Sequence, residues 1–195
     1  MDSGSEAAMT NVMKDKFLKP YIFTISALFF GAILQGYILA AQNKEIAQAI
    51  ISGLAEDLNF LSDSPSAFVF LFIFLNNSIK TFFSLILGFF FGLIPLLFIA
   101  INGLAIGLVI YIVSQDIGFL KIILGILPHG IFEIYATILT QAIGLWLGIK
   151  FYKKIIKKEP FKPHLIWALK KYFKIALPLL LGAALIETFI TPLFI

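Results

Sequence analysis

Long apolar runs alternate with short polar segments along the chain, and this pattern predicts helices that cross a membrane. Residues 21–41, 131–149 and 175–195 are each apolar almost throughout. About 20 residues of α-helix are needed to cross a hydrocarbon core of roughly 30 Å, so each run is long enough for one span. We therefore expect an all-α, polytopic transmembrane helix bundle with about six membrane segments, some of them short or re-entrant.

The apolar region of residues 67–127 is interrupted by polar or helix-breaking residues, namely Asn76, Asn77, Lys80, Pro95, Asn102 and Gly103. Two partitions fit: short helices that break near Lys80 and Asn102, or two long spans that meet near Phe91. An odd number of crossings is needed in either case. We prefer the first partition, since the second leaves an ammonium group near the membrane centre at a cost of about 2.5 kcal/mol or more.

Residues 117–127 form an apolar stretch that is too short to cross the membrane alone. The stretch ends in Pro128, His129 and Gly130, and the full-length run 131–149 follows. We expect a half-helix or re-entrant segment here, which is tolerated where its backbone faces protein or water.

Acidic and basic residues are concentrated in different polar segments. The segment 42–66 carries four acidic residues against a single lysine, whereas lysines precede the first apolar run. The segment 150–174 holds nine of the 15 basic residues. By the positive-inside rule, residues 1–20 and 150–174 are cytoplasmic, and residues 42–66 and the C-terminus are extracytoplasmic. Residues 21–195 then form a single membrane domain.

Both polar segments also carry apolar residues at helical spacing. In the outer segment an apolar residue recurs every four positions: Ile46, Ile50, Leu54 and Leu58. This spacing predicts a surface helix that lies on the membrane or caps the bundle. In the segment 150–174 apolar residues alternate with lysines, so we expect an amphipathic helix on the inner leaflet, in contact with anionic lipid headgroups.

The composition excludes several classes of function. The chain has no cysteine, which rules out disulfides, thiolate catalysis and cysteine metal sites. All basic residues are lysine, and bidentate recognition of phosphates and bases favours arginine, so nucleic acid is not an expected partner. The first apolar run is too long for the core of a signal peptide, and we interpret it as a retained first span.

Three glycine pairs have the four-residue spacing that lets two helices approach closely: Gly88 with Gly92, Gly103 with Gly107, and Gly144 with Gly148. The pairs can serve helix packing within one subunit or contacts between the subunits of a homo-oligomer. We favour packing within one subunit, because glycine is common in membrane helices generally.

The most informative polar residues lie in the stretch 127–133. Pro128 suits a first helical turn, and Glu133 is then close to the positive end of the helix dipole. His129 and Glu133 are four residues apart on one helix face, as in half of a metal site or an acid–base pair. A metal needs further ligands, and His164 is expected on the cytoplasmic side. We therefore favour a structural turn and expect neither a tightly bound metal nor another cofactor.

Several polar residues are expected inside the membrane, where unpaired polar groups are costly. We expect them to form one buried polar cluster: Asn76, Asn77, Lys80, Asn102, His129, Glu133 and Glu187. The cluster can act as hydrogen-bonded structural glue or as a hydrophilic path for a proton or solute. We favour structural glue, with Lys80 as a counter-ion for a glutamate.

Four segments of the chain, at residues 74–77, 102–107, 127–133 and 186–192, carry a family resemblance. In their order and spacing they resemble the stage II sporulation protein M family of membrane proteins. The resemblance covers the chain from about Phe68 onward, and the block Pro-His-Gly-Ile-Phe-Glu is its most specific part. Residues 1–66 show no match.

The resemblance implies a multi-pass scaffold without enzymatic activity that docks membrane or cell-envelope proteins. The best-known members of the family anchor a cell-wall remodelling complex in spore formers, in which partner proteins cut peptidoglycan. Relatives occur in bacteria and archaea that do not form spores.

Two other functions stay open. One is a small transporter or channel with a site around Glu133 and Glu187, and a weaker one is an intramembrane hydrolase that uses Glu133 and His129. A scaffold predicts a dry, hydrogen-bonded core. A transporter predicts a cavity that reaches a glutamate from one side, and a hydrolase predicts two convergent catalytic groups around a wet pocket.

Overall fold

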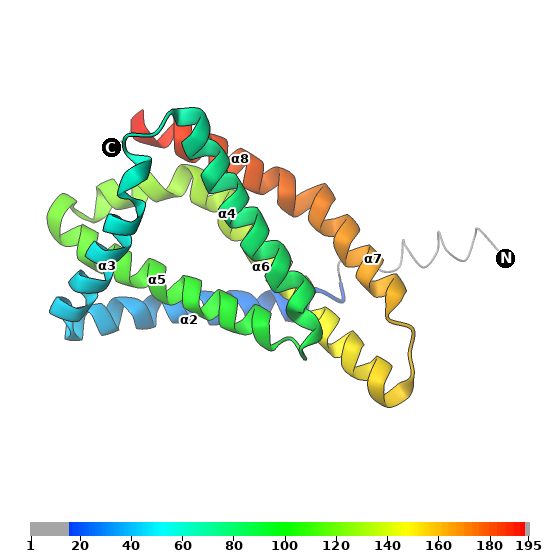
Figure 1. Ribbon diagram of the computed structural model, residues 1–195. Coiled ribbons are helices and arrows are strands. Elements are labelled where there is room, and N and C mark those ends of the chain that lie inside the picture. The colour runs from blue at the N-terminus through cyan, green and yellow to red at the C-terminus, as the bar shows by residue number, and fades with distance from the viewer. Residues whose placement is uncertain (1–15, 194–195) are drawn as a thin grey trace.

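The structure, a computed structural model, describes residues 16–193, which form helices joined by short turns (Figure 1). The α-helices are α2 (Lys19–Gln42), α3 (Lys44–Leu58), α4 (Ser66–Ile86), α5 (Leu93–Ile117), α6 (Phe119–Lys157), α7 (Lys162–Lys171) and α8 (Leu177–Phe189). Short 3-10 turns lie at Asn59–Leu61, Leu87–Phe89 and Thr191–Leu193, and a π-helical turn at Tyr172–Ala176 joins α7 to α8. This part of the chain contains no strand, so the expected all-α fold is confirmed.

Five helical stretches among the described residues are long and apolar enough to cross a membrane. They are Lys19–Gln42, Ser66–Phe89, Leu93–Ile117, Phe119–Lys157 and Lys162–Leu193. The chain is therefore a multi-pass membrane protein, as the apolar runs predicted. It has five long spans where the sequence suggested about six segments, because the apolar stretch after α5 belongs to α6.

The spans run back and forth between two ends of the molecule (Figure 1). The helix α3 lies across one end, and the turn between α6 and α7 lies at the opposite end. The acidic segment and the lysine-rich segment are thus at opposite ends of the bundle. Three spans, α4, α5 and α6, connect them, which is an odd number, as the charge pattern requires.

The helix α3 caps the bundle, which is one of the two placements expected for it. Its buried residue Ala47 packs with Ala40 of α2 and Ile112 of α5 in one apolar cluster. The apolar residues that the sequence placed on one face of this helix stay exposed. The bundle therefore fixes the position of α3 without covering that face.

The chain reverses between α4 and α5 near Phe91, and not at the polar residues. Phe91 and Gly92 have positive φ angles of 53° and 77°, the left-handed conformation that commonly separates two helices. Lys80 lies inside α4 and Asn102 lies inside α5. The preferred breaks at these two residues are wrong, and the alternative of two long spans that meet near Phe91 is the one found.

Neither polar residue forces its helix to end. The amide of Asn102 donates to the Phe98 carbonyl at 2.8 Å, a bond within its own helix. Lys80 is exposed on α4 and lies nine residues before the end of the span Ser66–Phe89, which is about 14 Å along the helix axis. The long side chain of Lys80 can extend from there toward the headgroups, which lowers the cost of an ammonium group in this span.

The helix α6 is continuous over 39 residues and contains the stretch expected to form a separate half-helix. Pro128 lies inside it, and Figure 1 shows that the first turns of α6 run in a different direction from the rest. Proline removes a backbone hydrogen bond and bends a helix, but the helix can continue beyond it. The expectation of a separate re-entrant segment is therefore wrong.

The lysine-rich segment does not form an amphipathic helix of its own. Its first lysines belong to the last turns of α6, which ends where Lys158 takes a left-handed φ of 55°. Its remaining lysines lie on or next to α7, which continues through the π-helical turn into α8. The apolar residues of this segment extend the surface of α6, because nothing between Ile149 and Lys157 interrupts the helix.

Glycines allow α2 and α5 to approach closely. A Cβ atom at Gly107 of α5 would overlap the backbone of Ile33 in α2, and Gly103 also faces α2. On α2, Gly36 meets the backbone of Leu104 in the same way. The two helices are therefore in backbone contact, which a larger side chain at the crossing would prevent.

The other expected glycines form a second close approach within the same chain. Gly88 meets the backbone of Gly144, and Gly148 meets the backbone of Gly92, where the turn after α4 touches α6. All six glycines of the three pairs thus lie against other helices or turns of one subunit.

A buried polar pair joins α4 to α6. The Ser84 hydroxyl donates to Gln141 Oε1 at 2.6 Å. The two residues are 4% and 0% exposed. The sequence analysis did not select this pair, although a glutamine within the apolar run 131–149 was a signal for a partner on another helix.

Ser84→Ala is expected to lower the free energy of unfolding by about 1–2 kcal/mol, because the buried Gln141 carbonyl loses its donor. Thermal unfolding in detergent measures the change. Ser114→Ala is the matched control, since the Ser114 hydroxyl bonds the Tyr111 carbonyl of its own helix. Equal melting temperatures for both variants and the wild type would contradict a stabilising role for the pair.

Candidate functional site

The helices α6 and α8 bring three of the expected polar residues together. His129 and Glu133 lie one turn apart on α6, and Glu187 lies on α8. One ligand atom of each residue, an imidazole nitrogen or a carboxylate oxygen, lies within 4.8 Å of those of the other two. All three residues are half-buried. We call these three residues the His-Glu-Glu cluster.

The imidazole of His129 is held by a hydrogen bond to Thr191. His129 Nδ1 lies 3.1 Å from Thr191 Oγ1, and Thr191 is 7% exposed. When Nδ1 carries the proton and donates it to the hydroxyl, Nε2 keeps a lone pair for a ligand. Thr191 was not among the candidate residues. The signal for Thr191 in the sequence was its position four residues after Glu187, which on a helix places the two side chains on one face.

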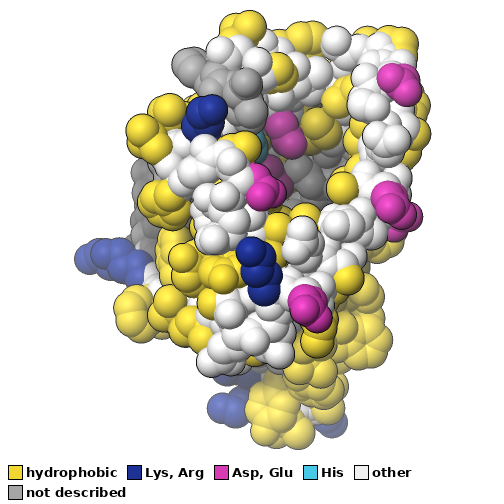
Figure 2. Space-filling view, turned by 90° about the vertical axis from the view of Figure 1, so that its left-hand side faces the viewer, with side chains coloured by type: hydrophobic (Ala, Val, Ile, Leu, Met, Phe, Trp, Pro, Cys, Tyr) yellow, Lys and Arg dark blue, Asp and Glu magenta, His cyan; other side chains and the backbone are white. Residues whose placement is uncertain are grey.

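A cavity of about 200 Å³ lies beside the cluster. It is lined by Phe29, Asn102, Ile106, Ile126, His129, Gly130, Glu133, Ile134 and Thr137. Figure 2 looks at the end of the molecule that carries α3, and it shows a hollow with acidic side chains and a histidine visible inside. The cavity gives the cluster an approach from this end of the bundle.

The structure does not bring all seven expected residues to one place. Asn76 and Asn77 lie side by side on α4, with Asn76 Nδ2 3.3 Å from Asn77 Oδ1. Asn76 and Lys80 line an exposed groove on the surface of α4. Within residues 16–193 Lys80 makes no ion pair with either glutamate of the cluster. Three of the seven, Asn102, His129 and Glu133, line the cavity, and Glu187 lies beside the last two.

His164 is far from the cluster, as the charge pattern predicted. Its ring lies 5.2 Å from the Trp146 ring, beside the lysine-rich end of the bundle.

Thr191 is close to His129, but it is buried and does not line the cavity. The hydroxyl of Thr191 is therefore placed to orient the imidazole, and not to attack a substrate in the cavity.

The His-Glu-Glu cluster has the composition to hold a proton or a cation. Two ionised carboxylates this close repel each other strongly in a low-dielectric environment. A proton shared between them, or a positive ion bound to both, offsets that repulsion. The imidazole adds a nitrogen that can accept a proton or coordinate a metal.

Comparison with known proteins agrees with the sequence resemblance and extends it. The family model described as Stage II sporulation protein M matches residues 25–192. The match begins inside α2, well before Phe68, and so includes part of the region in which the sequence motifs showed none. An uncharacterized protein of Methanocaldococcus jannaschii is 30% identical over 178 residues, which cover 89% of this chain and 94% of that protein. No solved structure matches the chain. The chain belongs to the stage II sporulation protein M family.

Proposed function

We propose that the protein is a membrane scaffold without enzymatic activity that docks a partner protein at the end of the bundle carrying α3. The observation that carries this proposal is a row of exposed apolar residues on α3. Ile46, Ile50, Leu54 and Leu58 are 62%, 46%, 50% and 47% exposed. We call these four residues the α3 row. The anchoring role implied by the family supports the proposal.

The position of α3 suits a docking element. Ala47 is buried against the bundle, so the helix is fixed while the α3 row beside it stays accessible. A contiguous row of large apolar side chains marks a surface that binds another protein or lipid. Glu56 and Asp57 follow near the end of α3, and their charges favour a partner with basic residues at its rim.

Photo-crosslinking in living cells tests the scaffold. A photo-reactive amino acid in place of Leu54 should form one discrete adduct with a protein, and Ile50→Ser should abolish that adduct. The matched control carries the same amino acid in place of Phe23, which is 75% exposed on α2 and faces outward from the bundle. The control should form no protein adduct. Adducts with lipid alone at both positions would contradict docking at α3.

A small transporter is the second candidate, and the cavity beside Glu133 favours it. Transporters place substrate sites beside bent or interrupted helices near the membrane centre. Here a bent helix carries Glu133, and the cavity of about 200 Å³ lies against it. Flux through vesicles that contain Glu133 variants separates this candidate from the scaffold.

We propose that the N-terminus and the lysine-rich segment face the cytoplasm and that α3 lies outside. The sorting of lysines to one end and acidic residues to the other supports this orientation. Single-cysteine variants test it cleanly, because the chain has no native cysteine. In intact cells a membrane-impermeant thiol reagent should label Glu56→Cys and should label Lys157→Cys only after lysis. The reverse pattern would overturn the orientation.

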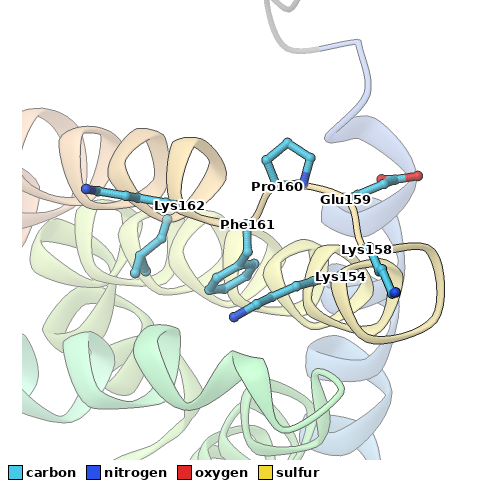
Figure 3. A pocket seen from close by; sticks show the side chains of 7 residues that line it. Lys154, Lys158, Glu159, Pro160, Phe161 and Lys162 are labelled. Atoms are coloured by element: carbon cyan, nitrogen blue, oxygen red, sulfur yellow. The ribbon is translucent and has the colours of Figure 1, made fainter.

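We also propose that the turn between α6 and α7 binds anionic lipid headgroups. A pocket of about 530 Å³ lies there, lined by Lys154, Lys158, Glu159, Pro160, Phe161, Lys162 and Leu165. Figure 3 shows the Lys154 side chain beside the ring of Phe161, and Lys154 Nζ lies 5.8 Å from the ring centroid. Three lysines around one hollow suit a phosphate-bearing headgroup.

The double change Lys154→Ser with Lys158→Ser is expected to reduce the retention of phosphatidylglycerol on the purified protein. Removing two of three ammonium groups weakens the attraction of the pocket for a negative headgroup by about 1 kcal/mol per lysine. Native mass spectrometry counts the bound lipids. Lys80→Ser is the control, since it removes a lysine from another surface. Equal loss of lipid in the control would contradict a specific site.

A further inference from the structure

We propose that His129, Glu133 and Glu187 form a binding site for a divalent first-row transition cation, with Zn²⁺ as its representative. The cation reaches the site through the cavity at the end of the bundle that carries α3. As candidate metal ligands the sequence analysis paired only His129 and Glu133, which are too few ligands for tight binding. The packing of α8 on α6 adds Glu187 as a third ligand.

The geometry of the three side chains is close to that of a metal centre. Bonds from Zn²⁺ to nitrogen or oxygen are about 2.0–2.2 Å, so two ligand atoms of a tetrahedral site lie roughly 3.3–3.6 Å apart. The ligand atoms of the cluster lie within 4.8 Å of one another. To bind one ion, the ligand atoms must move closer by up to roughly 1–1.5 Å, and we expect rotation of the two glutamate side chains to supply this.

Thr191 gives the histidine the support that metal ligands commonly have. A histidine that binds a metal through one ring nitrogen usually donates the hydrogen of the other nitrogen to a fixed acceptor. The hydroxyl of Thr191 is such an acceptor, 3.1 Å from His129 Nδ1. This bond orients the ring and leaves Nε2 as the nitrogen that coordinates the ion.

A bound cation would offset the negative charge of the two carboxylates in the cluster. Two carboxylates lie side by side within membrane-spanning helices, and among the described residues neither forms an ion pair with a lysine. A divalent ion offsets both negative charges at once, whereas a single proton offsets one. The ligand set of one imidazole and two carboxylates suits Zn²⁺, Mn²⁺ or Fe²⁺ better than Mg²⁺ or Ca²⁺, which prefer oxygen ligands throughout.

The cavity supplies the open side of the site. Two of the three ligands, His129 and Glu133, also line the cavity, which is large enough for water. The Asn102 side chain lines it as well, and because its nitrogen donates to the Phe98 carbonyl, its oxygen is left as an acceptor. Three protein ligands with a fourth position open to water or solute describe an accessible cation site, in contrast to a closed structural one.

Zinc titration of the full-length protein in detergent, after treatment with a chelator, tests the proposal. Isothermal calorimetry should show one Zn²⁺ per chain, and millimolar Mg²⁺ should not displace it. His129→Ala and Glu187→Gln should each weaken zinc binding at least tenfold, and Thr191→Ala should weaken it by about 10–100-fold as the loss of an orienting partner. Glu56→Gln on α3 is the control and should bind zinc like the wild type.

Two results would overturn the proposal. The first is a wild-type protein that binds no stoichiometric zinc in the titration, a result that needs no variant to interpret. The second is zinc binding that is unchanged in His129→Ala and Glu187→Gln, or that is equally weakened in Glu56→Gln. Melting temperatures measured in the presence of chelator identify any variant that fails to fold. If a variant fails to fold, its zinc affinity cannot be compared with that of the wild type. The zinc-edge X-ray absorption spectrum of the wild type is then measured, and it should show mixed nitrogen and oxygen ligands and no sulfur.

Discussion

Gly36→Ala is expected to lower the free energy of unfolding by about 2 kcal/mol or more, because a well-packed crossing has no room for an added methyl group. A Cβ atom at Gly36 would overlap the backbone carbonyl of Leu104 in α5. Backbone atoms cannot rotate away as side chains can, so α2 and α5 must separate and lose contact along the whole crossing. Gly36→Leu is expected to prevent folding.

Gly31→Ala on the same helix is the matched control for Gly36→Ala. A Cβ atom at Gly31 meets nothing within 4 Å. Alanine is a better helix former than glycine by about 1 kcal/mol, so this change should leave stability equal or slightly higher. Chemical unfolding in detergent measures both variants. If Gly36→Ala proved as stable as Gly31→Ala, α2 and α5 would not be in contact at this glycine.

The sequence identified only one half of this crossing. Gly103 and Gly107 of α5 stood out as a glycine pair, whereas the matching row on α2 is formed by Ala32, Gly36 and Ala40, all of which are buried. Two of these residues are alanines, which do not stand out among the apolar residues of a membrane span. A search for small residues at four-residue spacing, and not for glycine alone, finds both halves.

The sequence was sufficient for the fold class and insufficient for the boundaries of the helices. The length of an apolar run and the sorting of charges are local properties, and they predicted a multi-pass helical bundle. The effect of a polar residue or a proline depends on its surroundings. Asn102 is satisfied inside its own helix, Lys80 is exposed on the surface of α4, and Pro128 is accommodated within the continuous helix α6. None of these outcomes can be read from the residue type.

The candidate site was predictable only as far as one helix extends. His129 and Glu133 are four residues apart, so any helix brings them together. Glu187 lies on another span, and its place beside them depends on how α8 packs on α6. Asn76 and Asn77 are equally polar, but Asn76 lines the exposed groove on the surface of α4 and Asn77 lies next to it. Both residues therefore stay outside the cluster. Polarity selected the candidates, and packing decided which of them meet.

Glu133→Gln and Glu133→Leu are expected to differ in stability by about 1–3 kcal/mol, with the leucine variant less stable, because only glutamine can donate a hydrogen bond to the neighbouring carboxylate. Glu133 and Glu187 are close enough to repel each other when both are ionised. Glutamine removes one charge and offers an amide donor to Glu187. Leucine removes the charge as well, but it leaves Glu187 half-buried without a donor.

Thermal unfolding of the two Glu133 variants in chelator measures this difference, and proton flux in reconstituted vesicles separates the two candidate functions. For a scaffold, wild type and Glu133→Gln should both give no pH-driven flux above that of empty vesicles. For a transporter, the wild type should give flux and Glu133→Gln should abolish it while its melting temperature stays intact. Glu56→Gln and Glu56→Leu on the exposed helix α3 are the controls and should not differ in stability. Equal stability of wild type, Glu133→Gln and Glu133→Leu would show that Glu133 and Glu187 do not interact, and it would remove the physical basis for a site formed by α6 and α8.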